Sequence, residues 1–352
     1  MTADWPDPEQ FNLTPPTPLH HPLDGEFARA AKAVIEQDRD AVVLLVCHVN
    51  PDGDALGSML GFGLGLRQLG FTRVVATFPE PFEVADAFGF MPGQDLLVHP
   101  AAVPDEPDLA ISFDAASVGR LAELAPALAA ASTWIMMDHH ASNPGFGGIH
   151  LIDPRAAATS VVAARLLDRL GVVPDRDIAT NLYVALVTDT GSFKFDLTTA
   201  EVHELAARLV QAGAEPAEVA RLVLDSRPFA AIQLLTTVLA RAELDQTAVT
   251  GKGLITSYAT LADLDRFGQP TPVLESFVDI LRTVEEADVA CLVKPMAEGQ
   301  WSVSLRSRGE TDVSMVAVAL GGGGHRLAAG FTGYGSVSDV LTSVRRKLDS
   351  PA

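Results

Sequence analysis

The chain has 352 residues, enough for about two domains that each bury a core of their own. Hydrophobic residues make up 48% and charged residues 20%, a balance that excludes wholesale disorder. The formal net charge of −20 excludes an extended basic groove for a long nucleic acid, so an anionic substrate must be small or must be neutralised locally by metal.

Residues 1–25 are rich in proline and polar side chains and lack the basic and apolar regions of a secretory signal. We expect a loosely ordered extension, in which the adjacent His20 and His21 are solvated rather than bound to metal. No stretch reaches the roughly 18 apolar residues of a membrane span. These features predict a cytoplasmic protein without a membrane partner.

Short apolar runs alternate with helical stretches over residues 26–225, which is typical of buried parallel strands covered by helices. The expected strands are residues 41–47, 74–78, 109–113, 133–137 and 182–187. The pattern predicts an α/β fold with a doubly wound, mainly parallel sheet. Gly61, Gly63 and Gly65 fall inside an expected helix, so they indicate close helix packing rather than a dinucleotide-binding loop.

Residues 200–244 have a helical pattern throughout, and we expect residues 226–245 to form a helical linker. Residues 246–352 then combine helices with strands, including a hairpin around residues 297–300, which predicts a smaller α+β domain. Cys47 and Cys291 lie far apart in apolar runs, so we expect two buried free thiols in strands.

Imidazole and carboxylate side chains follow four of the expected strands. They are His48 with Asp52 and Asp54, then Asp114, then Asp138, His139 and His140, and finally Asp189. The carboxyl ends of strands in an open α/β sheet surround one crevice, where so many carboxylates would repel each other unless cations neutralise them. A single such Asp can equally cap the next helix, but the four ends together favour two divalent metals. The mixed nitrogen and oxygen donors favour Mn²⁺, with Co²⁺, Fe²⁺ or Mg²⁺ as alternatives.

Five motifs carry a family resemblance. The segment His48-Val-Asn-Pro-Asp-Gly-Asp-Ala-Leu-Gly-Ser58, Asp114 followed by Arg120, the triplet Asp138-His-His140 and the segment Asp189-Thr-Gly-Ser-Phe193 resemble, in order, the motifs of the DHH phosphoesterase superfamily. The segment Gly321-Gly-Gly-Gly-His325 resembles the signature of the DHHA1 substrate-binding domain. The two-domain layout is most similar to the bifunctional oligoribonuclease and 3′-phosphoadenosine 5′-phosphate phosphatase subfamily.

The resemblance implies two metal sites that share one carboxylate. The ligands of one metal would be His48 and Asp52, those of the other Asp54, His139 and Asp189, and the bridging ligand Asp114. A hydroxide bridging the metals would be the nucleophile. Asp138 would orient an imidazole, and His140 would contact the phosphate or donate a proton to the leaving oxygen. The alternative for His140 is a structural histidine bonded to the backbone.

In the second domain, Gly322, Gly323 and Gly324 would let backbone N–H groups approach a phosphate or carboxylate closely. His325 and Arg306 would supply positive charge on the far side of the substrate. A solvated arginine on a strand face is the alternative for Arg306.

The predicted reaction is hydrolysis of phosphodiester or terminal phosphate bonds in short nucleotides, namely oligoribonucleotides of a few residues, 3′-phosphoadenosine 5′-phosphate, or linear and cyclic dinucleotides. Long duplex nucleic acid is not expected, and the resemblance suggests a homodimer. The alternatives are a single-strand exonuclease of the RecJ kind, an inorganic pyrophosphatase of the same family and a non-catalytic nucleotide sensor. The RecJ kind carries a further nucleic-acid-binding domain for which this chain has no room.

Overall fold

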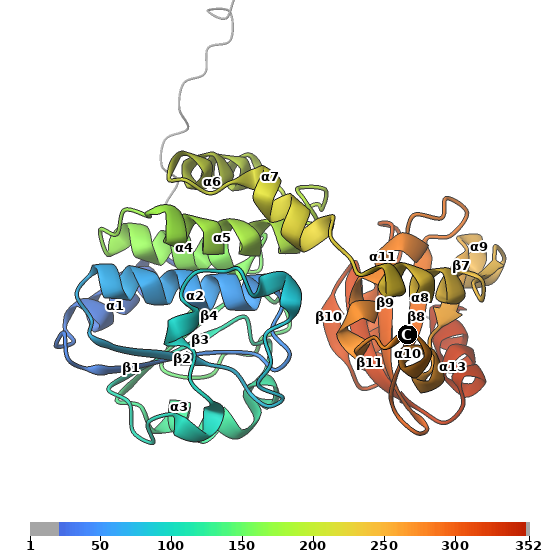
Figure 1. The fold of residues 1–352 in the computed structure, drawn as a ribbon, viewed down its shortest axis with the longest axis horizontal. Coiled ribbons are helices and arrows are strands. Elements are labelled where there is room, and N and C mark those ends of the chain that lie inside the picture. Colours follow the sequence, from blue (N-terminus) through green and yellow to red (C-terminus); the bar gives the residue numbers. More distant parts are fainter. Residues whose placement is uncertain (1–20, 350–352) are drawn as a thin grey trace, which may run out of the picture.

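A computed structural model describes residues 21–349, which form two lobes joined by a helical segment (Figure 1). Residues 1–20, most of the expected N-terminal extension, lie outside the described residues, as do residues 350–352. Within residues 21–349 no single helix has the length and apolarity to cross a membrane. The pair Pro216–Leu224 and Phe229–Leu239 reaches them only together, across a bend of 59°.

The first lobe is built on a parallel sheet of five strands in the order β2-β1-β3-β4-β5. The strands are β1 (Val42–Cys47), β2 (Arg73–Thr77), β3 (Leu109–Phe113), β4 (Thr133–Asp138) and β5 (Ile149–Ile152). Every residue of β3 is buried, which explains a continuous apolar run without alternation. The predicted parallel sheet is therefore confirmed, with β5 as a strand that the apolar pattern did not reveal.

Helices cover both faces of this sheet. They are α1 (Asp24–Ile35), α2 (Gly53–Gln68), α3 (Ala125–Ala130), α4 (Thr159–Arg169), α5 (Arg176–Asp189) and α6 (Ala200–Gln211). Figure 1 shows α2, α4 and α5 on one side of the sheet and α3 on the other. Along β1, Val43 and Leu45 belong to the core beneath α2, whereas Leu44 and Val46 belong to the core beneath α3. This is the doubly wound arrangement expected from the sequence.

The glycines of α2 allow close packing, as expected. A Cβ atom at Gly57 would lie 2.3 Å from the carbonyl oxygen of Asn181 in α5, and one at Gly63 would lie 2.9 Å from Leu45 in the sheet. Most of the close approach is therefore between α2 and its neighbouring helices, with Gly63 facing the strands. No dinucleotide-binding loop is formed by these residues.

The prediction of a strand at residues 182–187 is wrong, because these residues lie in α5. The Asp175 side chain caps this helix by accepting hydrogen bonds from the backbone N–H groups of Asp177 and Ile178. The helix contacts α2, α4 and α6, so its residues are buried from Leu182 to Val187 without interruption. A helix without a polar face shows no 3.6-residue period, and its apolar run cannot be distinguished from a buried strand.

The connecting segment is helical for most of the predicted stretch. It contains α6, α7 (Pro216–Val219), a π-helical turn (Ala220–Leu224) and α8 (Phe229–Leu239). It ends in a short strand, β6 (Glu243–Asp245), where helix was expected. Leu234 and Val238 of α8 lie in a buried cluster with residues of the second lobe.

The second lobe contains a mixed sheet of six strands in the order β10-β11-β9-β8-β7-β6. Its remaining strands are β7 (Leu254–Tyr258), β8 (Val289–Ala297), β9 (Gln300–Ser307), β10 (Gly323–His325) and β11 (Ala328–Tyr334). Its helices are α9 (Ala248–Gly251), α10 (Leu261–Phe267), α11 (Phe277–Leu281), α12 (Val313–Ala319) and α13 (Val337–Asp349). The expected α+β lobe is confirmed, including the hairpin in which Ala297 pairs with Gln300.

Both cysteines are buried free thiols, Cys47 in β1 and Cys291 in β8, as the sequence predicts. Burial raises the pKa of Cys291 to about 12, and burial with the neighbouring charge of Asp52 raises the pKa of Cys47. Neither thiol is therefore a reactive group at neutral pH.

Candidate metal centre between the lobes

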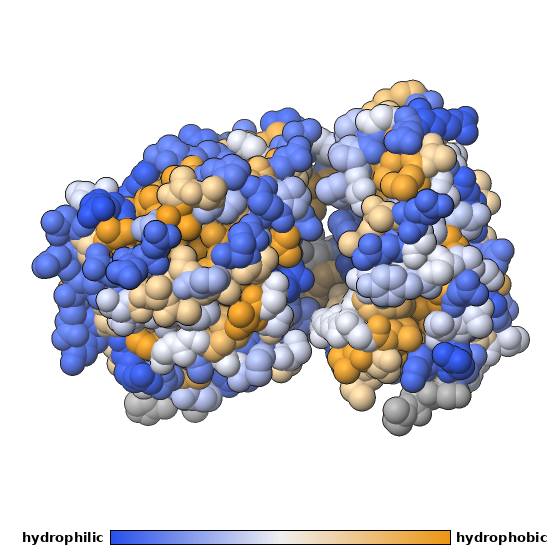
Figure 2. Space-filling view, turned by 90° about the horizontal axis from the view of Figure 1, so that it is seen from below, coloured by the Kyte–Doolittle hydropathy of each residue, from blue (hydrophilic) through white to orange (hydrophobic). Residues whose placement is uncertain are grey.

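The first lobe brings the predicted ligands to one edge of its sheet. His48 follows β1, Asp114 follows β3 and Asp138 ends β4, so three parallel strands deliver these side chains to a common edge. Asp189, expected at a strand end, is instead the last residue of α5. The predicted ligands therefore lie together as expected, although one of the four elements that carry them is a helix and not a strand. Figure 2 shows a cleft between the two lobes.

One group of potential ligands consists of His48, Asp52 and Asp114, whose ligand atoms all lie within 4.8 Å of one another. His48 Nδ1 lies 2.8 Å from the carbonyl oxygen of Val49, which can only accept, so Nδ1 carries a proton and Nε2 is the nitrogen that faces the carboxylates. This Nε2 lies 3.4 Å from Asp114 Oδ2 and 3.9 Å from Asp52 Oδ2.

Asp52 has two roles. Its Oδ1 accepts hydrogen bonds from the backbone N–H groups of Asp54 and Ala55 and so caps α2. Its Oδ2 remains directed at His48, 3.9 Å away. Helix capping and metal binding, which the sequence analysis treated as alternatives, are therefore compatible at this residue.

The second group consists of Asp54, His139 and Asp189, again within 4.8 Å of one another. His139 Nδ1 lies 3.2 Å from the carbonyl oxygen of Ala156, which fixes the protonated nitrogen and leaves Nε2 for the group. That Nε2 lies 3.0 Å from Asp189 Oδ2 and 3.9 Å from Asp54 Oδ2.

Asp114 lies between the two groups. Its Oδ2 is 3.4 Å from His48 Nε2, and its Oδ1 is 3.6 Å from His139 Nε2. The backbone of Asp114 has a left-handed φ of 55°, which only a few non-glycine residues adopt and which directs its side chain away from the strand path. Each oxygen of this one carboxylate therefore faces a different imidazole.

Burial and mutual repulsion shift the pKa values of the carboxylates in the cluster. Burial raises the pKa of Asp54 well above its usual value, and the charges of Asp114 and Asp189 raise it further. Burial also raises the pKa of Asp189, although the hydrogen bond with His139 opposes the change. Burial acts in the same direction on Asp114, but the hydrogen bond with His48 and the charges of His140 and His139 outweigh it and lower the pKa.

The imidazoles respond to these carboxylates. Burial alone would lower the pKa of His139, but its hydrogen bond to Asp189 and the charges of Asp189 and Asp114 raise it well above the ordinary value. The pKa of His140 is raised in the same way, against burial, mainly by Asp138. The carboxylates and imidazoles of the cluster thus interact strongly with each other.

Asp138 organises the DHH triplet. Its Oδ1 accepts hydrogen bonds from the backbone N–H of His139 at 2.8 Å and from His140 Nδ1 at 2.7 Å. Its Oδ2 accepts one from Asn143 Nδ2 at 2.5 Å. Asp138 is thus fully occupied in orienting its neighbours, and the hydrogen bond to His140 Nδ1 fixes the tautomer that leaves His140 Nε2 for other partners.

The second lobe meets this cluster through His325. Its ring stacks on that of His140 with centroids 4.4 Å apart and lies 5.0 Å from the ring of His139. Burial and the charges of His140 and His139 lower the pKa of His325 to about 3, so it is neutral at pH 7. The expectation that His325 lies on the far side of the substrate differs from the structure, in which it lies directly against the DHH triplet.

Arg306 lies on β9 of the second lobe, with its Nε 3.3 Å from Asp279 Oδ1. Its Nη1 donates a hydrogen bond to the carbonyl oxygen of Leu305. The side chain is 22% exposed, which makes it neither a freely solvated arginine nor a fully buried one.

The glycines before His325 differ in what they permit. A Cβ atom at Gly322 would lie 2.1 Å from the carbonyl oxygen of Gly330. Gly324 has a φ of 137°, and a Cβ atom there would lie 2.6 Å from the carbonyl oxygen of Ala328 in β11. Gly322 and Gly324 are therefore required by the β10–β11 hairpin itself. A Cβ atom at Gly323 would meet nothing within 4 Å, so of Gly322, Gly323 and Gly324 it is Gly323 that has open space for a ligand.

The sequence analysis missed side chains that hold the ligands. Thr159 donates from its Oγ1 to Asp114 Oδ1 at 2.9 Å and from its backbone N–H to Asp54 at 2.6 Å. Ser160 N–H and Ser58 Oγ also donate to Asp54. The buried carboxylate of Asp54 thus faces the N-terminus of α4, where backbone N–H groups are free. The available signal was the Thr-Ser pair that opens an expected helix.

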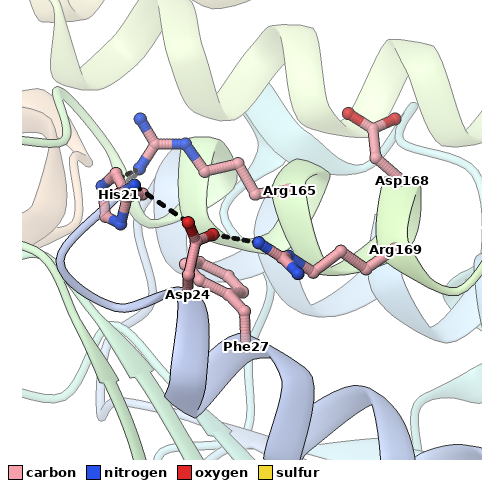
Figure 3. A pocket seen from close by; sticks show the side chains of 6 residues that line it. All are labelled: His21, Asp24, Phe27, Arg165, Asp168 and Arg169. Carbon is pink, nitrogen blue, oxygen red and sulfur yellow. Dashed lines mark hydrogen bonds and ion pairs between the residues drawn. The ribbon is translucent and has the colours of Figure 1, made fainter. Parts of the chain in front are cut away.

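A pocket of about 350 Å³ between α1 and α4 contains none of the predicted site residues (Figure 3). His21 lines it and lies 2.8 Å from Asp153, which also accepts a hydrogen bond from Arg165. The expectation that His21 is solvated is therefore wrong, and His20 lies outside the described residues. Arg169 in turn is paired with Asp24. The charges around this pocket are already matched, so it does not compete with the cluster as a metal or phosphate site.

The residues present fit a pair of divalent cations. Each group offers imidazole nitrogen and carboxylate oxygen, the donors that Mn²⁺, Fe²⁺ and Co²⁺ accept. The raised pKa values of Asp54 and Asp189 show an excess of negative charge in a buried place, which cations would relieve. Two other groups, one of His139, His140 and His325 and one of Asp114, Asp138 and His140, are also close enough to hold an ion.

Comparison with known families agrees with this fold and site. The DHH family, N-terminal domain, matches residues 42–186, and the DHHA1 domain matches residues 252–350. The chain therefore belongs to the DHH/DHHA1 phosphoesterase superfamily, and it is a hydrolase acting on ester bonds.

Within that superfamily the chain is most like the bifunctional oligoribonuclease and phosphatase subfamily. It is 33% identical to the bifunctional oligoribonuclease and PAP phosphatase NrnA of Thermus thermophilus over 87% of this chain and 90% of the relative. It is 26% identical to the probable NrnA of Streptococcus mutans, over 83% and 89% of the two chains. An exopolyphosphatase-related protein from Bacteroides fragilis shares the fold, with a TM-score of 0.80 at 23% identity over 92% and 95% of the chains.

Proposed function

We propose that this chain hydrolyses phosphodiester or terminal phosphate bonds in short nucleotides with the help of two divalent metals, of which Mn²⁺ is the first candidate. The observation that carries the proposal is the position of Asp114, whose two oxygens face His48 and His139, one from each group of potential ligands. Two cations held there would activate a water as hydroxide and stabilise charge on the phosphate.

The chain's own residues would orient the substrate and move a proton. His140 is held by Asp138 through Nδ1 and has Nε2 available, the arrangement needed to donate a proton to a leaving oxygen. His325, neutral and stacked on His140, restricts access to that ring from the side of the second lobe. Arg306 and Gly323 would contact the part of the substrate remote from the scissile bond, whereas His325 would contact it beside His140.

The substrates that we propose are oligoribonucleotides of a few residues, 3′-phosphoadenosine 5′-phosphate, and linear or cyclic dinucleotides. The relatives named for oligoribonuclease and PAP phosphatase activity support short substrates, and the net charge of −20 disfavours long ones.

A product ladder tests this function. RNA and DNA of two to twenty-four nucleotides, labelled at one end, would be incubated with Mn²⁺ or Mg²⁺, beside 3′-phosphoadenosine 5′-phosphate and cyclic dinucleotides. We expect metal-dependent turnover that is fastest for the shortest RNA. Equal or faster degradation of long single strands would support an exonuclease of the RecJ kind. Tight nucleotide binding without products under either metal would support a non-catalytic sensor.

The organisation of the chain is part of the proposal. We propose a catalytic domain at residues 26–225, a linker at 226–245 and a substrate-binding domain at 246–352. Leu234 and Val238 of the proposed linker are buried with residues of the second lobe, so α8 packs on that lobe. Cytoplasmic localisation and a homodimer are also proposed. Exposed Phe229, Ile232 and Leu239 give α8 an uncharged apolar face that is available for self-association, which sedimentation would measure.

A further inference from the structure

The loop that follows the potential ligand Asp189 has an unusual backbone. Gly191, Ser192 and Phe193 all adopt left-handed φ values, of 56°, 60° and 62°. Such values cost about 1–2 kcal/mol for a non-glycine residue, so they persist only where surrounding contacts enforce them. Ser192 N–H donates to the carbonyl oxygen of Val187 at 2.8 Å, which ties the loop to the last turn of α5.

The loop places the ring of Phe195 with little freedom. The backbone N–H of Phe195 donates to the carbonyl oxygen of Thr190 at 3.1 Å, and Thr190 Oγ1 accepts from the N–H of Phe193 at 2.9 Å. A Cβ atom at Gly191 would lie 2.4 Å from the Phe195 ring, so the ring rests directly on that glycine. The position of Phe195 is thereby fixed relative to Asp189.

A side chain of the second lobe meets this ring from the other side. The guanidinium of Arg282, the residue that follows α11, lies 5.0 Å from the ring centroid of Phe195. The distance is within the range of a cation–π interaction. The Arg282 side chain is 24% exposed, so the contact is partly shielded from water. Phe195 is thus held between Gly191 of its own loop and Arg282 of the opposite lobe.

Arg282 is linked in turn to the predicted substrate-binding arginine. Asp279 Oδ1 lies 3.6 Å from Arg282 Nε and 3.3 Å from Arg306 Nε. Within residues 21–349, neither Asp279 Oδ1 nor Arg282 Nε forms a hydrogen bond, although both atoms are buried. One carboxylate oxygen therefore lies within ion-pair distance of two guanidinium groups and links their positions.

These contacts form a continuous path from Asp189 through Phe195, Arg282 and Asp279 to Arg306. We propose that Arg282 and Phe195 are positioning residues that set the spacing of the two lobes, so that Arg306 and the metal ligands reach the same short substrate. The role in substrate alignment rests on the function proposed above, whereas the role in lobe spacing does not. Neither residue touches the reacting atoms.

The spacing is measured without any reaction. Nitroxide labels would be attached to cysteines introduced at exposed Glu204 in α6 and Glu298 in the β8–β9 hairpin, since Cys47 and Cys291 are buried. We expect Arg282→Ala and Phe195→Leu each to broaden the distribution of distances between the labels. The matched control is Arg266→Ala, because Arg266 stacks on Phe267 within one lobe at 5.1 Å. Distributions that stay as narrow as those of wild type and control would overturn the proposal.

Kinetics test substrate alignment. A cation–π contact of about 0.5–2 kcal/mol corresponds to a change of about 2- to 30-fold. We expect Arg282→Ala to raise KM for a diribonucleotide by this factor with a smaller effect on kcat. The rate of hydrolysis of bis(4-nitrophenyl) phosphate, which has no nucleoside to contact the second lobe, should fall less. Phe195→Leu should raise the same KM, whereas Phe195→Tyr, which keeps the aromatic ring, should leave the KM for the diribonucleotide close to that of wild type.

Three results separate the explanations. An equal loss for the aryl ester and the diribonucleotide would mean that Arg282 merely supports the fold of the site, and would overturn the alignment role. An unchanged KM in Arg282→Ala would do the same. If wild type hydrolyses neither substrate under any metal, the proposed function fails, while the label distances still decide whether the two residues set the spacing.

Discussion

Asp114 has a left-handed backbone conformation, and its buried carboxylate is surrounded by imidazoles. Its φ of 55° turns the carboxylate toward His48 and His139 at once, and Thr159 Oγ1 holds one of its oxygens. Strain of this kind is retained where it serves a site. In the structure, three imidazoles surround this carboxylate, so its charge is favoured rather than opposed.

Asp114→Asn tests the bridging position. Asparagine keeps the size of the side chain and tolerates a left-handed φ, so the backbone should be preserved. We expect turnover to fall at least about a thousandfold, because several kcal/mol of metal-dependent stabilisation is lost. Elemental analysis should find close to two metals per wild-type chain and fewer in the variant. Two metals retained with full activity would contradict a bridging role.

His140→Ala separates chemistry from binding. A proton donor contributes about 10²- to 10⁴-fold to kcat, so the variant should lose kcat with a smaller change in KM. His150, an accessible histidine on β5 whose ring bonds only to the carbonyl oxygen of Gly147, provides the control as His150→Ala. A normal kcat with a raised KM would make His140 a ground-state phosphate contact instead.

At the scale of elements, secondary structure was predicted correctly from the sequence where a residue pattern has a single physical cause. Buried parallel strands produce uninterrupted apolar runs, and four of the five strands were found in that way. The same logic misassigned α5, because a helix enclosed by α2, α4 and α6 is apolar on all sides. Asp189 was nevertheless placed at the site, because it follows this apolar run whether the run is a strand or a helix and because its motif also identified it.

Contacts between distant residues were beyond the reach of the sequence pattern. The donors Thr159 and Asn143 are ordinary polar residues until the fold brings them to Asp54, Asp114 and Asp138. The stacking of His325 on His140 depends on how the lobes meet, which no local periodicity encodes. The motifs thus identified the ligands, while the groups that orient them required the structure.

The packing of α2 on α5 gives a paired stability test. A Cβ atom at Gly57 would overlap the carbonyl oxygen of Asn181 at 2.3 Å, and rigid backbone cannot give way cheaply. We expect Gly57→Ala to lower the free energy of unfolding by about 1–3 kcal/mol. Gly25→Ala on α1 meets nothing within 4 Å and should raise it by about 0.5–1 kcal/mol through helix propensity alone. Denaturant unfolding of both variants checks the contrast, and equal effects would contradict the packing argument.

A second test at this scale concerns the attachment of α8 to α10. Arg241, just after α8, donates two hydrogen bonds to Asp263 in α10, which also caps its helix with Thr260. The hydrogen bonds from Arg241 lower the pKa of Asp263, against burial and with help from Thr260. Because the pKa of this carboxyl group is lower in the folded than in the unfolded chain, the ion pair stabilises the fold at pH values above the ordinary pKa of about 4. The stabilisation is lost as the pH falls from there toward the pKa of the folded state.

Asp263→Asn should therefore cost about 1.5–3 kcal/mol of unfolding free energy at pH 7, the range for hydrogen bonds to charged groups, and clearly less at pH 3. Asp265→Asn, an exposed carboxylate on the same helix, should change little at either pH. Urea unfolding at both pH values checks this. A cost for Asp263→Asn that is the same at pH 3 and pH 7 would show that the ion pair does not stabilise the fold.

At the scale of the whole molecule, charge and shape act together. Under the proposed function, a phosphate in the cleft between the lobes would be met by metals, Arg306 and the Gly323 backbone, whereas the chain as a whole carries a net charge of −20 (Figure 2). A short substrate can place its scissile phosphate on the metals and its other end against the second lobe. A longer strand has to leave the cleft across an acidic surface that repels each further phosphate.

Turnover should therefore fall as the substrate grows beyond a few nucleotides, and the fall should be steeper at low salt, where repulsion is screened least. Arg306→Ala should weaken the shortest substrates most, because they alone combine metal contact with contact to the second lobe. Arg308→Ala is the matched control: it removes the same charge from the end of the same strand, but its guanidinium bonds to the carbonyl oxygen of Val284.

Steady-state kinetics on RNA of two, five and twenty-four residues at two salt concentrations measure these effects. If Arg306→Ala and Arg308→Ala reduce all lengths equally, the second lobe contributes general charge and does not select for length. If wild type degrades the 24-mer as fast as the dimer at low salt, the acidic surface does not limit access. Selection by length requires both the steep fall in wild type and the selective loss in Arg306→Ala, because repulsion alone acts on long substrates and end recognition alone acts on short ones.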